Sequence, residues 1–156
     1  MHDGAIESIE QLNHLLDEQD GWVTTLANAS AYLNEFLTNI NWVGFYLLQD
    51  GVLRLGPFQG KPACTRIAIR NGVCGAAIAQ NRTQLVADVH TFPGHIACDS
   101  ASNSELVVVL RDGEGSPIGV LDIDSPLIAR FTQADARSME RAAAIISHKI
   151  RQSIDE

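Results

Sequence analysis

The sequence predicts an α+β fold, in which an antiparallel sheet carries helices on one face. Amphipathic helical patterns lie towards both ends of the chain, over 6–37 and 132–155. Two hairpin signals lie between them, at Asp50-Gly51 and in the turn 112–115. Strands joined by such tight turns pair antiparallel, and the flanking helices are expected to pack together on the sheet.

The composition suits one soluble domain. With 156 residues, 46% of them hydrophobic and 19% charged, the chain can bury one core, so we expect a single domain over 1–156. The net charge of −8 argues against a nucleic-acid or anionic-membrane partner, because both require a basic surface. No apolar run reaches the roughly 20 residues that span a bilayer, and the N-terminus does not resemble a signal peptide. We therefore expect a cytoplasmic protein.

Two helices are expected in the N-terminal segment 1–40. Apolar residues recur at helical spacing over 6–16, and Asp20-Gly21 interrupts the pattern. A second amphipathic stretch covers 23–37 and should end near Asn39.

Strand patterns dominate the segment 41–125, which should hold the sheet and the active-site loops. A short helix is expected over 72–80 and a long loop over 88–102. Thr132, with Asp135 three residues later, forms a capping-box pattern that opens a C-terminal helix over 132–155. The strands are expected at 42–48, 52–55, 65–69, 85–86, 106–110 and 118–123.

Three cysteines give the first indication of chemistry. Cys98 lies in the long loop between His95 and Asp99, where a thiol is accessible and an imidazolium would favour its thiolate, although Asp99 would oppose it. Cys64 follows a turn-rich stretch whose mobility would let it reach Cys98. Cys74 lies at an expected helix start, whose dipole favours a thiolate. Cys98 and Cys74 are also open to a second interpretation, as small buried residues.

A zinc site is another interpretation of these thiols. His95 and Cys98 have a suitable ligand spacing, but Cys64 and Cys74 lie too far apart to form the close cysteine pair of structural zinc sites. We therefore expect no metal.

Carboxylates form a second group of candidates. Asp122 and Asp124 are two residues apart on an expected strand and therefore project from one face. Glu105 begins the neighbouring strand and can join them across the hairpin. Like charges held close together oppose ionisation, so one of these carboxyl groups would keep a proton near neutral pH. A solvated strand face is the alternative, although the strand is otherwise largely apolar.

Trp42, Gly44 and Tyr46 share one face of the first expected strand. Two aromatic side chains around a glycine would leave a shallow slot for a small alkyl group. Ordinary core packing is the commoner cause of such a pattern.

A loop thiol, an acid cluster and an apolar slot together suit a sulfoxide substrate that carries an ammonium group. A thiolate attacks the sulfur, and a protonated carboxyl group donates to the departing oxygen. The remaining carboxylates would hold the ammonium group.

Six short motifs occur in order along the chain: NWVGFY at 41–46, LGPFQG at 55–60, GVCG at 72–75, GHIACD at 94–99, SNSE at 102–105 and GVLDIDS at 119–125. Together they closely resemble the motifs of the free methionine-(R)-sulfoxide reductases, which are stand-alone GAF-domain enzymes. The resemblance extends from about 41 to 131. It implies a GAF-like fold with a sheet of about six antiparallel strands, a homodimer, and a part in the response to oxidative stress.

The resemblance also implies roles for single residues. Cys98 is the nucleophile and becomes a sulfenic acid as free methionine leaves. Cys64 resolves it to a disulfide, with Cys74 as the alternative or as a second relay. Thioredoxin, recycled with NADPH, then reduces the disulfide, and no bound cofactor is implied. The implied substrate contacts are Glu105, Asp122 and Asp124 for the amino group and sulfoxide oxygen, Trp42 and Tyr46 for the methyl group, and the backbone of Ile96 and Ala97.

A GAF-type sensor that binds a small ligand without catalysis is the competing class. A sensor has no need for three thiols near an acidic pocket, so we expect an enzyme.

Overall fold

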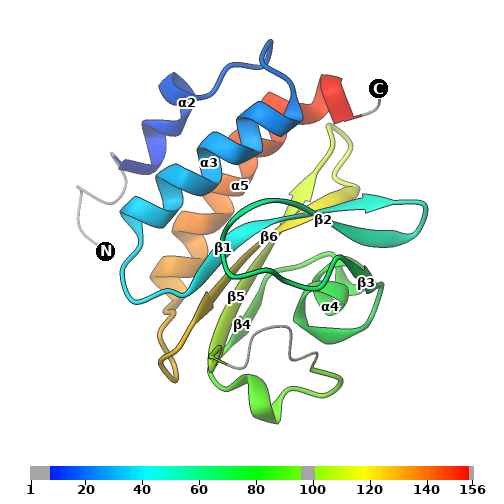
Figure 1. Cartoon of the computed structure of the whole chain (residues 1–156). Helices are drawn as coiled ribbons and strands as arrows, with labels where there is room; N and C mark the ends of the chain where they lie inside the picture. The colour runs from blue at the N-terminus through cyan, green and yellow to red at the C-terminus, as the bar shows by residue number, and fades with distance from the viewer. Residues whose placement is uncertain (1–7, 96–100, 155–156) are drawn as a thin grey trace.

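A six-stranded antiparallel sheet forms the centre of the fold, as Figure 1 shows. The computed structural model describes residues 8–95 and 101–154. The strand order is β3-β2-β1-β6-β5-β4, so the hairpins β1–β2 and β5–β6 meet along β1 and β6 in the middle. The strands are β1 Trp42–Gln49, β2 Val52–Gly60, β3 Arg66–Ala68, β4 Gln84–Val86, β5 Ser104–Arg111 and β6 Pro117–Ser125. The predicted α+β class is confirmed.

Three helices, α2 (Leu12–Leu15), α3 (Trp22–Phe36) and α5 (Gln133–Ile154), cover one face of the sheet (Figure 1). Strand alternation supplies the apolar layer beneath them, because every second residue of β1, such as Phe45, points towards these helices. No helix within 8–95 and 101–154 has the length and apolar character to cross a membrane.

The opposite face of the sheet packs against α4 (Gly72–Gln80) and the segments around it, as Figure 1 shows. Trp42 and Tyr46 of β1 belong to this second apolar layer, and so do Cys74 of α4 and Val120 of β6. The candidate residues therefore lie on the face away from α3 and α5.

Several element boundaries differ from those expected. β2 continues to Gly60 through an irregularity in its pairing with β1, where Gly56 and Pro57 of β2 lie opposite the single residue Phe45. The missing N–H of Pro57 is tolerated at such a position. Helix α3 ends at Phe36, earlier than expected, and Asn39 takes a left-handed conformation with φ 57°.

Two further helix predictions can be compared with the structure. The first predicted helix is described from Ser8, with a turn at Gln11 before α2. The predicted capping box of α5 is confirmed, since the N–H of Thr132 donates to Asp135 Oδ2 at 2.8 Å and the N–H of Asp135 donates to Thr132 Oγ1 at 3.1 Å.

Candidate active site

Three neighbouring strands bring polar and aromatic side chains into one row. Trp42 of β1 pairs with Asp124 of β6, which pairs with Glu105 of β5. Adjacent strands lie roughly 4.8 Å apart, so the three side chains are direct neighbours on the sheet. Asp122 lies in the next row of the same face, as its spacing from Asp124 predicts. The predicted acid cluster is thus formed by strand register.

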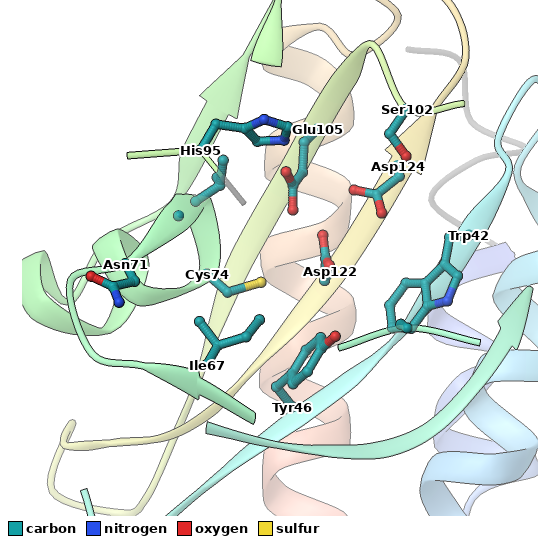
Figure 2. A pocket seen from close by; sticks show the side chains of 13 residues that line it. Trp42, Tyr46, Ile67, Asn71, Cys74, His95, Ser102, Glu105, Asp122 and Asp124 are labelled. Carbon is teal, nitrogen blue, oxygen red and sulfur yellow. The ribbon is translucent and has the colours of Figure 1, made fainter. Parts of the chain in front are cut away.

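These side chains line a cavity of about 40 Å³. Figure 2 shows the carboxyl groups of Glu105, Asp122 and Asp124 directed towards one another, with the sulfur of Cys74 beside Asp122. Trp42 and Tyr46 border the same space on its other side. Side chains from β1, β5, β6 and α4 therefore converge on one point.

The cavity is strongly acidic. Glu105 and Asp122 are only 8% and 6% exposed, and among the described residues no lysine or arginine lines the cavity. Burial, reinforced by the charges of Asp122 and Asp124, raises the pKa of Glu105 well above its usual value. Burial also raises the pKa of Asp122, but hydrogen bonds with Glu105, Asp124 and Cys74 act in the opposite direction. Of these two carboxyl groups, Glu105 is therefore the better suited to keep a proton near neutral pH.

Cys74 lies in the first turn of α4 and is 3% exposed. Burial and the neighbouring carboxyl groups of Asp122 and Glu105 raise the pKa of its thiol. This direction is opposite to the one expected from the helix dipole, because desolvation outweighs the partial charge at the helix start. Cys74 is a free thiol in this structure, and its raised pKa favours the neutral form.

Trp42 and Tyr46 lie on one face of β1, as predicted, but the slot predicted over Gly44 is filled by Phe58. The rings of Trp42 and Tyr46 stack with centroids 6.0 Å apart, and Phe58 stacks on the other side of Trp42 at 5.1 Å. A Cβ atom at Gly44 would lie 2.2 Å from the Cβ of Phe58. Core packing by Phe58 thus explains the glycine, and the two aromatic side chains line the cavity next to it.

We expect Gly44→Ala to lower the free energy of unfolding by about 1–3 kcal/mol, because the added methyl group overlaps the side chain and backbone of Phe58. Chemical denaturation measures the loss. Gly113→Ala is the matched control, since a Cβ there meets no atom within 4 Å. Equal stabilities of the two variants would contradict this packing.

The aromatic side chains also anchor the segment that carries Cys64. Trp42 Nε1 donates to the carbonyl of Lys61 at 3.1 Å, and the hydroxyl of Tyr46 donates to the carbonyl of Cys64 at 2.9 Å. Burial raises the pKa of Tyr46, so its hydroxyl keeps the proton that it donates. Cys64 itself is part of a disulfide.

The central part of the predicted loop cannot be compared with the structure, because Ile96, Ala97 and Cys98 lie outside the described residues. His95, which precedes them, lines the cavity. Burial, followed by the nearby His90, lowers the pKa of His95. A neutral ring is therefore favoured there over the imidazolium that the sequence suggested.

Asn71 and Ser102 also line the cavity, and the sequence did not single them out. Their only sequence signal is position: Asn71 directly precedes the GVCG motif, and Ser102 begins the SNSE motif. Polar side chains of this kind are too common on loops to be recognised without the fold.

Comparison with known proteins identifies the family of this chain. A family model described as GAF domain matches residues 21–151. The free methionine-R-sulfoxide reductase of Escherichia coli (strain K12) is 54% identical over 132 residues, which are 85% of this chain and 79% of that protein. The enzyme of the same name from Saccharomyces cerevisiae is 41% identical, covering 90% of this chain and 84% of its own length.

A solved structure extends the likeness to three dimensions. The free methionine-R-sulfoxide reductase of Neisseria meningitidis in complex with its substrate superimposes with a TM-score of 0.88 at 42% identity, covering 98% of this chain and 93% of that one. The chain therefore belongs to the GAF-domain family of free methionine-R-sulfoxide reductases.

Proposed function

We propose that this protein reduces free L-methionine-(R)-S-oxide to L-methionine. The observation that carries the proposal is the cluster of the buried Glu105 and Asp122 with the half-buried Asp124. It lies beside Trp42 and Tyr46, without a lysine or arginine among the described lining residues. Such a cluster favours an ammonium group, and the aromatic pair favours a methyl group on sulfur. The (R) epimer is taken from the named relatives.

The first step in this mechanism transfers oxygen from substrate to protein. The Cys98 thiolate attacks the sulfoxide sulfur while Glu105 donates its proton to the sulfoxide oxygen. The oxygen then passes to the cysteine sulfur, so that Cys98 becomes a sulfenic acid and methionine leaves. Sulfur of the substrate is reduced by two electrons, and sulfur of Cys98 is oxidised by two.

The second step forms a disulfide. The thiol of Cys64 attacks the sulfenic acid and water leaves with its oxygen. The pairing with Cys64 rather than Cys74 is supported by two observations: Cys64 is part of a disulfide, and Cys74 is free. We assign Cys98 as the partner of Cys64 in this step, because Cys98 carries the sulfenic acid that the first step forms.

Recycling completes the proposal. The dithiol of reduced thioredoxin exchanges with the disulfide, restores both cysteines and becomes oxidised, and NADPH reduces thioredoxin in turn. We further propose that the enzyme works as a cytoplasmic homodimer without a bound cofactor.

A coupled assay tests the function. Purified protein, thioredoxin, thioredoxin reductase and NADPH are combined with free methionine sulfoxide of either epimer or with its N-acetyl derivative. We expect NADPH oxidation with the free (R) epimer, and a kcat/KM lower by about 10⁴ for the N-acetyl compound, because its missing ammonium group leaves the buried acids unpaired. Absence of NADPH oxidation despite saturable binding would favour a sensor.

Tyr46→Phe should slow the second step more than the first. The variant keeps the ring but loses the hydrogen bond to the Cys64 carbonyl, so we expect the rate of disulfide formation to fall by about 5- to 10-fold, equivalent to about 1 kcal/mol. Release of the first methionine, measured by rapid quench without reductant, should change less than twofold. Tyr32→Phe is the control, because that hydroxyl donates to Ser8 outside the cavity. Equal slowing of both steps would contradict an anchoring role.

A further inference from the structure

Cys74 is a buried nucleophile that the proposed chemistry does not consume. Its sulfur and one carboxyl oxygen each from Glu105 and Asp122 lie within 4.8 Å of one another. All three residues are more than nine-tenths buried, and they come from α4, β5 and β6 rather than from the Cys64 segment. The donor set is one thiolate and two carboxylates.

A second observation favours a cation at this position. Asp122 lines the cavity, and its Oδ1 atom is buried and has no hydrogen-bond partner among the described residues. A buried carboxylate oxygen in that situation is costly unless a positive charge or a donor meets it. Among the described lining residues the only basic side chain is His95, whose neutral form is favoured.

The size of the cavity also suits an ion. Its volume is about 40 Å³, whereas a cavity that binds benzene has roughly 150 Å³ and a single water needs roughly 10–15 Å³. The space is therefore large enough for an ion with a bound water.

We propose that Cys74, Glu105 and Asp122 bind one zinc-class divalent cation. Zinc accepts mixed sulfur and oxygen ligands at roughly 2.3 and 2.1 Å, so tetrahedral ligands lie roughly 3.5 Å apart and the side chains close by about 1 Å on binding. The thiol of Cys74 and the carboxyl group of Glu105 each lose a proton, Asp122 binds as the carboxylate, and water completes the coordination. The ion is an inhibitor and not a cofactor, because it occupies the carboxyl groups assigned to the ammonium group; this consequence rests on the proposed function.

The test uses the full chain with Cys64→Ser and Cys98→Ser, in which Cys74 is the only thiol. Calorimetric titration with zinc chloride and elemental analysis after dialysis should give one zinc per chain. Adding Cys74→Ala should weaken zinc binding by at least 10-fold, and Glu105→Gln should do the same, whereas Glu114→Gln on the exposed β5–β6 turn should not. Cobalt chloride should produce a thiolate-to-cobalt charge-transfer band that is lost with Cys74.

The outcomes separate the two proposals. Absence of stoichiometric zinc, or binding that survives Cys74→Ala within twofold, overturns the metal site. If Cys74→Ala does not fold, Cys74→Ser and the cobalt spectrum decide the same question. Free L-methionine should weaken zinc binding, because both compete for the same carboxyl groups. If one zinc still binds at Cys74 with unchanged affinity in saturating methionine, the metal site is supported and the proposed ammonium subsite is contradicted.

Discussion

Cys98→Ser is expected to lower thioredoxin-coupled turnover by about 10³-fold or more, with little change in the thermal stability of the reduced protein. A serine hydroxyl stays protonated at neutral pH and is a far weaker nucleophile towards sulfur than a thiolate. It also cannot accept the oxygen as a sulfenic acid does. NADPH oxidation with free methionine-(R)-sulfoxide measures the effect, and thermal unfolding shows whether the variant is folded.

Cys64→Ser provides the matched comparison. Without reductant this variant should still release one methionine per chain, because it retains the nucleophile and lacks only the proposed resolving thiol. Repeated turnover by Cys98→Ser would contradict the assignment of Cys98 as the nucleophile, without contradicting the proposed reductase function. Release of several methionines per chain by Cys64→Ser without reductant would contradict the proposed sequence of sulfenic acid formation and disulfide formation.

Glu105→Gln is expected to lower turnover by about 10²- to 10⁴-fold, because the amide cannot donate the proton that the sulfoxide oxygen requires. The same change should raise thermal stability at neutral and alkaline pH. The reason is the raised pKa of Glu105, which makes its ionised form costly inside the buried cluster.

The pH dependence of stability and of turnover follows from the raised pKa of Glu105. The folded-state pKa of Glu105 lies well above its ordinary value of 4.5, so its contribution to stability is fully present below pH 4.5 and is lost as pH rises through the folded-state pKa. Glutamine stays neutral, so the melting temperature of Glu105→Gln minus that of the wild type should increase with pH. Wild-type turnover should fall over the same range as the proton donor is lost.

An exposed carboxyl group serves as the control for both effects. Glu114→Gln should leave turnover and the pH profile of melting unchanged, since its side chain lies on the exposed turn between β5 and β6. If Glu105→Gln lowered stability and activity together, with no dependence on pH, Glu105 would be a structural residue and the proton donor would have to be sought elsewhere.

Local patterns predicted most of the fold. The predicted helix over 72–80 coincides with α4, and the capping box of Thr132 and Asp135 is present. Asp122 and Asp124 project from the same face of β6, as predicted, because strand alternation depends only on neighbouring residues. Boundaries were less accurate where distant partners decide them: β2 reaches Gly60 because it remains paired with β1 as far as Trp42.

The class of fold, the faces of its strands and the residue types available for chemistry can be read from the amino-acid sequence, since they depend on periodicity and composition. The tertiary structure places Trp42, Asp124 and Glu105 in one row, which depends on the register of β1 against β6, whose paired residues Trp42 and Asp124 lie about 80 positions apart. It also decided that Phe58 fills the space over Gly44 and that the Cys74 thiol is held neutral. Close packing and desolvation arise from the whole assembled core, and no local pattern encodes them.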